Sequence, residues 1–234
     1  MIYASIVAGG LGSRMGDTNL PKQFLRLNDK PILIYSIQKF FDIMDITKIF
    51  VLVPESYVEY TEELVKKFIG HSERIIILKG GINRNDTVMN SIRYIQDNLG
   101  IDKNDICITH DAARPFVTEE IILENIEKAS RFGAVTTAVQ ATDTILISLD
   151  NDRIDKVPQR DNMYQCQTPQ TFNINLLLKC YERLTDEEKE KLTDVTKIFI
   201  LQGETVKIAK GEYFNIKITT QTDLIVAESI LFKC

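Results

Sequence analysis

A glycine-rich segment near the N-terminus carries residue types that could bind a phosphate group. Residues 8–14 are AGGLGSR, and Lys22 follows a short distance along the chain. Glycine has no Cβ, so backbone N–H groups in such a segment can approach an anion closely. Arg14 and Lys22 add two cations at its edge. The segment is not a P-loop, because no lysine directly follows its last glycine. A tight strand-to-helix connection with solvated basic residues is the alternative interpretation.

The elements expected around this segment form an alternating β-α pattern. An apolar run at residues 3–7 predicts a buried strand that leads directly into the glycines. Further strands are predicted at residues 49–54, 74–78, 106–109 and 134–139, and helices at about residues 31–40, 56–68, 85–94 and 118–130. This order is typical of an α/β fold with a doubly wound, mostly parallel sheet, which binds ligands outside the carboxyl ends of its strands.

Residues 140–165 break the alternation. Residues 144–148 and 153–157 have strand-like patterns on either side of the turn Asp150-Asn151-Asp152. We therefore treat residues 1–234 as a single domain with residues 140–165 as a β-arm subdomain. Because a two-stranded arm is marginally stable alone in water, it should pack against something, most simply a second subunit. A hairpin folded back on its own domain is the alternative.

Composition narrows the classes of function. The 234 residues, 44% of them hydrophobic, suffice for one large domain. The net charge of −5 favours neither nucleic acid nor an anionic membrane as a partner. The four cysteines have no C-x-x-C spacing and predict reduced thiols. No apolar run approaches the ~20 residues that span a bilayer, and the basic n-region of a signal peptide is missing. We expect a soluble cytoplasmic protein.

Six motifs resemble a known family. In chain order they are AGGLGSRMG…PKQF, GGINRNDTV, HDAARPF, QTPQTF, LTD and NIKITTQTDL. Over essentially its whole length the chain is similar to CTP-dependent polyol-phosphate cytidylyltransferases, the group containing 2-C-methyl-D-erythritol 4-phosphate cytidylyltransferase and ribitol-5-phosphate cytidylyltransferase. The resemblance implies a Rossmann-like nucleotidyltransferase fold with a β-hairpin arm for dimerisation. It also implies CTP and a small polyol phosphate as substrates, a homodimer with arm-completed active sites, and Mg²⁺ or another divalent cation as cofactor.

The family reaction implies roles for individual residues. An oxygen of the acceptor phosphate attacks the α-phosphorus of CTP and displaces pyrophosphate, so catalysis depends on alignment and electrostatic stabilisation. The catalytic residues implied by resemblance are Arg14 and Lys22 on the triphosphate and Lys217 on the α-phosphate. The implied nucleotide-binding residues are Ala8, Gly9, Gly10, Gly12, Gly81, Asn83, Arg84, Thr87, Asp111 and Ala112. The implied acceptor-binding residues are Asp111, Thr144, Arg160, Thr168 and Lys217, with Thr144 and Arg160 acting across the dimer.

For three side chains we expect a specific contact or role. Asp111 is the candidate metal contact, although Mg²⁺ usually takes most of its oxygens from phosphates and water; an ion pair with Arg114 is the alternative. His110 is interpreted as a structural hydrogen-bonding residue, since a phosphate acceptor is already ionised and needs no general base. Lys217 lies between two isoleucines in an expected strand, and its ammonium needs a partner there. We expect that partner to be phosphate.

The acceptor is predicted from finer resemblance. Residues 163–172, 192–199 and 210–220 look closer to the ribitol-5-phosphate branch, and the chain has no tryptophan, whereas the erythritol branch more often has one ahead of T-P-Q. The expected product is therefore CDP-ribitol, a cell-wall, teichoic-acid or capsule precursor. HDAARP is at least as close to the erythritol-type enzymes of isoprenoid precursor synthesis, which are the alternative. More remote alternatives are a sugar-1-phosphate nucleotidyltransferase using UTP or dTTP, and a non-catalytic nucleotide-binding regulator. The presence of both Lys22 and Lys217 counts against the regulator.

Overall fold

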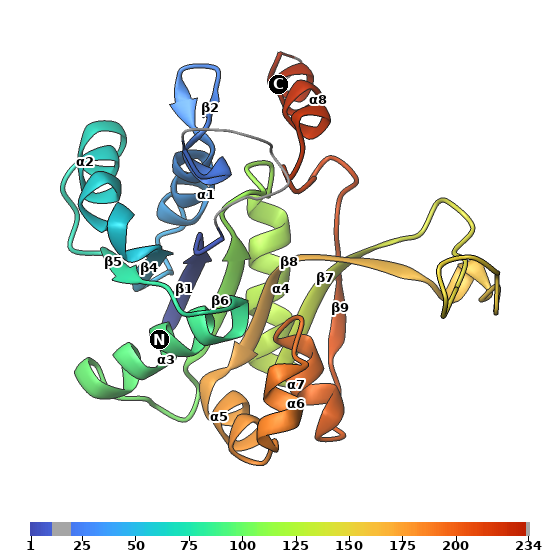
Figure 1. The fold of residues 1–234 in the computed structure, drawn as a ribbon. Coiled ribbons are helices and arrows are strands. Elements are labelled where there is room, and N and C mark those ends of the chain that lie inside the picture. The colour runs from blue at the N-terminus through green and yellow to red at the C-terminus, as the bar shows by residue number, and fades with distance from the viewer. Residues whose placement is uncertain (11–19, 233–234) are drawn as a thin grey trace.

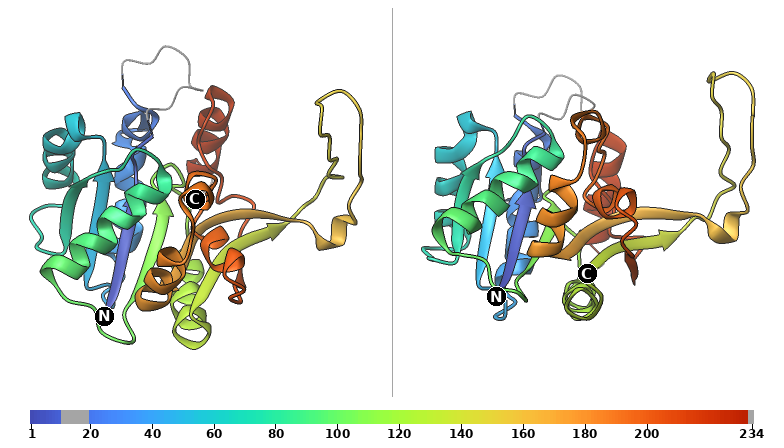
Figure 2. Two further views of the ribbon diagram at one scale, coloured as in Figure 1. Left: turned by 60° about the horizontal axis from the view of Figure 1, so that its bottom comes forward. Right: turned by 90° about the horizontal axis from the view of Figure 1, so that it is seen from below.

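A mixed β-sheet with helices on both faces forms the centre of the molecule (Figures 1 and 2). The computed structural model describes residues 1–10 and 20–232, so the predicted site residues Gly12 and Arg14 lie outside the described residues. Within that part, the seven strands are β1 (Ile2–Val7), β4 (Lys48–Val53), β5 (Ile75–Lys79), β6 (Ile106–Asp111), β7 (Ala134–Gln140), β8 (Tyr164–Asn173) and β9 (Lys207–Lys210). Their order is β5-β4-β1-β6-β8-β7-β9. Only β8 pairs in the antiparallel sense within this sheet. The predicted mostly parallel α/β fold is confirmed.

The helices follow the strands along the chain. They are α1 (Ile32–Phe41), α2 (Val58–Phe68), α3 (Arg84–Asn98), α4 (Glu119–Phe132), α5 (Ile174–Glu182), α6 (Asp186–Glu190), α7 (Thr196–Leu201) and α8 (Gln221–Leu231). Short 3₁₀ turns occur at η2 (Lys22–Phe24), η3 (Glu55–Tyr57) and η4 (Arg160–Asn162), and β2 (Arg26–Leu27) pairs with β3 (Lys30–Pro31) as a separate ribbon.

The two largest hydrophobic cores lie on opposite faces of the sheet. Successive residues of a strand point to opposite faces, so one strand contributes to both cores. In β4, Ile49 and Val51 pack in the core that includes α1, α2 and α4. Phe50 and Leu52 of the same strand pack in the core that includes α3, α5 and α7. Burial on both faces explains why this strand is an unbroken apolar run in the sequence.

The strand order places a crevice between β1 and β6. The chain passes from β1 to β4 and β5 on one side, then returns to β6 on the other side of β1. Val7 and Asp111, the last residues of these two parallel strands, are paired in register. Such a reversal of strand order leaves a crevice at the carboxyl ends, where α/β sheets bind ligands.

Several segments differ from the sequence prediction. β8 was not predicted. Its buried polar residues lie in the sheet because β8 pairs with both β6 and β7. Residues 215–219 were expected to be a strand, but they are irregular chain that leads into α8.

The arm projects from the body between the ends of β7 and β8 (Figure 1). The expected strands at 144–148 and 153–157 are not regular; Ile147 and Lys156 form one isolated antiparallel bridge. The predicted turn is present, because Asp150 accepts backbone N–H bonds from Asp152 and Arg153 at 3.1 and 3.0 Å. Local hydrogen bonding thus makes the turn, but few cross-strand bonds extend it.

Candidate active site

A cavity of about 340 Å³ lies at the carboxyl ends of β1 and β6. All of the predicted nucleotide-binding and catalytic residues within the described chain line it: Ala8, Gly9, Gly10, Lys22, Gly81, Asn83, Arg84, Thr87, Asp111, Ala112 and Lys217. They come from four separate segments, which follow β1, β5 and β6 or precede α8. The tertiary structure therefore brings the predicted residues together at the crevice that the strand order creates.

The segment between β5 and α3 is held in a fixed shape by Thr87. Its Oγ1 accepts the N–H of Gly81 at 2.9 Å and donates to the carbonyl oxygen of Asn83 at 2.8 Å. A Cβ on Gly81 would lie 2.6 Å from the carbonyl carbon of Asp86. Only glycine fits there without a shift of the chain. Thr87 thus shapes the loop, and its hydroxyl proton is already committed.

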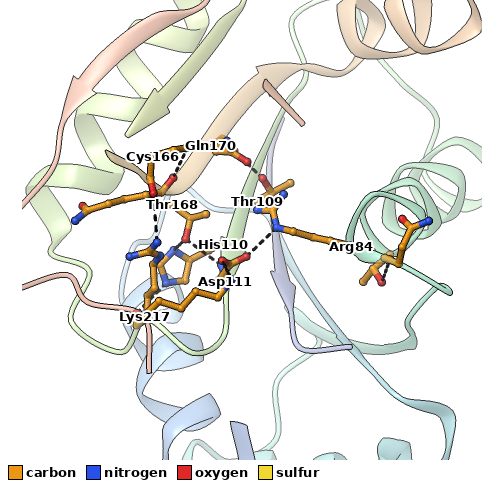
Figure 3. A network of polar contacts seen from close by, with 12 residues as sticks. Arg84, Thr109, His110, Asp111, Cys166, Thr168, Gln170 and Lys217 are labelled. Atoms are coloured by element: carbon orange, nitrogen blue, oxygen red, sulfur yellow. Dashed lines mark hydrogen bonds and ion pairs between the residues drawn. The ribbon is translucent and has the colours of Figure 1, made fainter. Parts of the chain in front are cut away.

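Asp111 is the centre of the charge network in this cavity. Its Oδ2 accepts from Nζ of Lys217 at 2.6 Å, and its Oδ1 accepts from Nε of Arg84 at 2.9 Å. Figure 3 shows the two cationic side chains reaching the carboxylate from different directions. The partner of Lys217 in this structure is therefore a carboxylate, whereas the sequence led us to expect phosphate. The alternative pairing of Asp111 with Arg114 is not among its ion pairs.

This pairing keeps Asp111 ionised. Burial by itself raises the pKa of the Asp111 carboxyl, but the Arg84 and Lys217 cations outweigh it, so the pKa lies well below its ordinary value of 3.8. Two cations facing one carboxylate leave a net positive charge at the end of β6. An anionic ligand is favoured at such a place.

His110 and Thr168 support Asp111 from behind the cavity. The N–H of Asp111 donates to Oγ1 of Thr168 at 3.1 Å, and this hydroxyl contacts Nδ1 of His110 at 3.1 Å. Nε2 of His110 lies 3.0 Å from the carbonyl oxygen of Arg114, so the carbonyl assigns the proton to Nε2. Burial lowers the pKa of His110 to about 4. The ring is neutral at physiological pH and acts as a structural hydrogen-bonding group.

Three predicted acceptor residues do not line this cavity. Thr168 is 4% exposed, and its hydroxyl is used in the contacts described above. Thr144 and Arg160 lie on or at the base of the arm, which extends away from the body (Figure 2). Within one chain, the structure does not bring these two residues to Lys217 and Asp111.

The donor set in the cavity suits a metal held by phosphate oxygens. Among the described residues, no group of three histidine, cysteine, aspartate or glutamate side chains could hold a metal ion. Asp111 is the one carboxylate among the lining residues that the structure describes, and both of its oxygens already accept from cations. A Mg²⁺ ion commonly needs only one or two carboxylates beside substrate phosphates. The residues therefore fit such an ion only if the substrate supplies most of its oxygens.

Several residues that line the cavity were not predicted from the sequence. Gln23, Ile82, Ala113 and Thr219 complete the wall of the cavity. Gln23 and Thr219 lie inside quoted motifs, PKQF and NIKITTQTDL, and their proximity to assigned lysines was the available signal. Ile82 and Ala113 also lie inside quoted motifs, GGINRNDTV and HDAARPF, but as apolar residues they were not assigned to the nucleotide; Ile82 is fully exposed on the segment that follows β5.

No helix of the described chain is both long and apolar enough to cross a bilayer.

Comparisons with known proteins show the family and the fold of the chain. The family model described as 2-C-methyl-D-erythritol 4-phosphate cytidylyltransferase (IspD) matches residues 2–233. A crystal structure of 4-diphosphocytidyl-2C-methyl-D-erythritol synthase from Anaerococcus prevotii is 29% identical, with a TM-score of 0.82 over 99% of this chain and 96% of that one. The 2-C-methyl-D-erythritol 4-phosphate cytidylyltransferase of Francisella tularensis is also 29% identical, with a TM-score of 0.80 over 97% and 98% of the two chains. The bifunctional IspDF of Campylobacter jejuni is 25% identical, with a TM-score of 0.75 over 96% of this chain and 53% of that one.

Proposed function

The chain belongs to the 2-C-methyl-D-erythritol 4-phosphate cytidylyltransferase family, and from that premise we propose that it transfers the cytidylyl group of CTP to 2-C-methyl-D-erythritol 4-phosphate. The family makes it a CTP-dependent nucleotidyltransferase that acts on a polyol phosphate. The two solved structures at 29% identity support the erythritol-type acceptor, which was the alternative in the sequence analysis. The observation that carries the proposal is the convergence of Lys22, Lys217 and the glycine backbone on one cavity.

The proposed step needs no covalent intermediate on the protein. An oxygen of the acceptor phosphate forms a bond to the α-phosphorus of CTP, and the bond from that phosphorus to the oxygen bridging to the β-phosphate breaks. The leaving electron pair stays on pyrophosphate. Lys22 and Lys217 supply positive charge beside the anions, and Asp111 holds Lys217 at the end of β6 until phosphate shares its ammonium. His110 plays no part as a base, because it is buried, its pKa is lowered to about 4, and its ring nitrogens face Thr168 and the Arg114 carbonyl.

A divalent cation belongs to this proposal. Mg²⁺ bound to the triphosphate would neutralise charge on the departing pyrophosphate. Asp111 is the candidate protein ligand of this ion. The ion could contact the Asp111 carboxylate only if the Lys217 ammonium turned away from it toward phosphate.

Ribitol 5-phosphate is the second candidate acceptor. The segments 163–172, 192–199 and 210–220, which resemble the ribitol branch, favour it. The acceptors differ by hydroxyls and one methyl, a difference that a pocket can discriminate by ~10- to 200-fold. Pyrophosphate release should be measured with CTP and each acceptor in turn. We expect the higher kcat/KM with 2-C-methyl-D-erythritol 4-phosphate. The opposite order assigns the ribitol acceptor, and no release with either one refutes both.

The nucleotide is tested separately by thermal shift. CTP with Mg²⁺ should raise the melting temperature more than UTP with Mg²⁺. An equal or larger rise with UTP would favour a sugar-1-phosphate nucleotidyltransferase instead.

We also propose that a second copy of the chain completes the acceptor site. The arm exposes four apolar side chains within twelve residues, Leu146, Leu149, Ile154 and Val157, each more than half exposed. Exposed apolar side chains gathered on one segment are typical of a surface that contacts another protein. A partner's arm would bring Thr144 and Arg160 to the cavity, and the planar guanidinium of Arg160 suits a phosphate. These apolar side chains are the support for a homodimer.

Mixing inactive variants tests this arrangement. Arg160→Ala and Lys217→Met chains are combined in equal amounts after each is shown to have lost activity. If Arg160 acts across the dimer, about half of the dimers are mixed with one intact site each, and activity recovers to about a quarter of wild type. Arg153→Ala, at the tip of the same arm, is the control and should stay active alone. No recovery on mixing, despite subunit exchange, contradicts the proposal.

A further inference from the structure

Gln23 joins two segments of the cavity wall. Its Nε2 donates to the carbonyl oxygen of Ala8 at 2.6 Å, across 15 positions of sequence, and the side chain is 2% exposed. Gln23 follows Lys22 in η2, and Ala8 follows β1. We propose that Gln23 is a positioning residue that sets the orientation of the nucleotide-binding backbone relative to Lys22. The inference rests on the proposed function and deepens it.

Peptide geometry gives the bond its consequence. In a trans peptide the C=O and the following N–H point in opposite directions. When the carbonyl of Ala8 points at Gln23, the N–H of Gly9 must therefore point away from it. Among the described residues, nothing accepts a hydrogen bond from that N–H, and Gly9 lines the cavity. The donor is thus held ready for an oxygen of the nucleotide.

The other side of Ala8 is also held. Its N–H donates to the carbonyl oxygen of Leu52 at 2.8 Å. The Leu52 bond therefore holds the Val7–Ala8 peptide, and the Gln23 bond holds the Ala8–Gly9 peptide that follows it. In the absence of Gln23, the Ala8–Gly9 peptide has no side chain to hold its carbonyl, and glycine permits a flip of the plane.

A second side chain does the same at the end of β6. Oγ of Ser36, on α1, donates to the carbonyl oxygen of Ala112 at 2.9 Å, and Ser36 is fully buried. The N–H of Ala112 donates to the carbonyl oxygen of Val7 at 3.0 Å. The buried side chains of Gln23 and Ser36 therefore hold the carbonyl groups of Ala8 and Ala112, the residues that directly follow β1 and β6 at the cavity. The presence of the same kind of bond at both strand ends indicates that buried side chains fix the peptide orientation along this side of the cavity.

The experiment replaces Gln23 with methionine, which has similar length but no donor. Kd for CTP is measured by calorimetry, beside kcat and KM for pyrophosphate release in the intact protein. Thr61→Val is the matched control, because Thr61 is fully buried on α2 and its hydroxyl donates to the carbonyl oxygen of Tyr57 at 2.6 Å, outside the cavity. Gln23→Glu is the second variant. Its carboxylate cannot donate to the Ala8 carbonyl at neutral pH.

We expect Gln23→Met to raise Kd for CTP about tenfold, and Gln23→Glu to raise it further. Thr61→Val should lower the melting temperature about as much as the Gln23 variants do, yet leave Kd for CTP within about twofold of wild type. Should Gln23→Met fail to fold, the comparison is made with Gln23→Glu and Thr61→Val. Binding of CTP by the Gln23 variants within twofold of wild type overturns the inference, as does an equal loss in Thr61→Val. If wild type binds CTP but releases pyrophosphate with neither acceptor, the proposed function fails while this inference is still decided by Kd.

Discussion

The substitution Asp111→Asn tests the charge network most directly. It removes the negative charge and leaves Lys217 and Arg84 facing a neutral amide. The Asp111 side chain is 9% exposed, and those of Lys217 and Arg84 are 35% and 20% exposed. The cations therefore keep part of their hydration, whereas the carboxylate keeps almost none.

The magnitude follows from these exposures. A hydrogen bond to a charged group contributes ~1.5–3 kcal/mol, so two such bonds set an upper range of ~3–6 kcal/mol. The partial exposure of both cations reduces this range, because water screens the unpaired charges. We expect Asp111→Asn to lower the free energy of unfolding by ~2–3 kcal/mol. For a chain of this size that corresponds to a fall in melting temperature of ~4–12 °C.

Urea unfolding followed by circular dichroism is the assay, with two companion variants. Glu127→Gln breaks the Glu127–Arg131 pair, in which both side chains are about two-thirds exposed, and should cost less than ~0.5 kcal/mol. The double variant Asp111→Asn/Lys217→Met removes one unpaired cation and should be more stable than Asp111→Asn alone. A double variant that shows the sum of both single losses would refute the network.

The pH dependence gives an independent check. The folded pKa of Asp111 lies below its ordinary value of 3.8, so the carboxylate stabilises the fold above that value. This contribution is lost only as pH falls through the lower folded pKa. The stability difference between wild type and Asp111→Asn should therefore stay constant from pH 8 to pH 5. A difference that vanishes by pH 5 would show that the carboxyl titrates in that range.

Three other predictions concern neighbouring features. The folded pKa of His110 is about 4, against an ordinary 6.5, so the unfolded chain takes up a proton at higher pH than the folded chain and the free energy of unfolding should fall by ~3 kcal/mol as pH drops from 6.5 to 4. His110→Gln should flatten the plot of this free energy, measured by urea unfolding, against pH in that range. An unchanged slope contradicts the low pKa of His110. Gly81→Ala should lower the melting temperature, since its Cβ would meet the backbone of Asp86 at 2.6 Å. Gly10→Ala should melt like wild type, because among the described residues its Cβ would meet nothing within 4 Å. Equal melting of the two variants counts against the steric argument. Burial raises the pKa of Cys107 to about 12, so mass spectrometry should find it unmodified by iodoacetamide at pH 8 until denaturant is added, and rapid labelling of the native protein would disprove its burial.

The apolar runs determined much of the fold in advance. Strand β4 is a continuous hydrophobic run, β1 is nearly so, and β6 begins with one, so their burial on both faces could be predicted locally. β8 could not be predicted in this way. Its residues Gln167 to Phe172 are buried, yet most are polar. Partners far along the chain satisfy most of their polar atoms, as Oγ1 of Thr196 does for Nε2 of Gln170 at 2.6 Å.

The same division holds for the site. Lys22 and the glycines after β1 were identified from residue types and their position after a predicted strand, since those properties are local. The segment at Gly81 was assigned to the nucleotide by the resemblance to the family. The ion pair of Lys217 with Asp111 joins residues 106 positions apart, and the bond from Gln23 to Ala8 depends on how η2 packs against β1. The sequence by itself determined which groups could bind a polyphosphate. Only the tertiary structure decided which of them face one another, because burial and distance between remote segments set their charges and their hydrogen bonds.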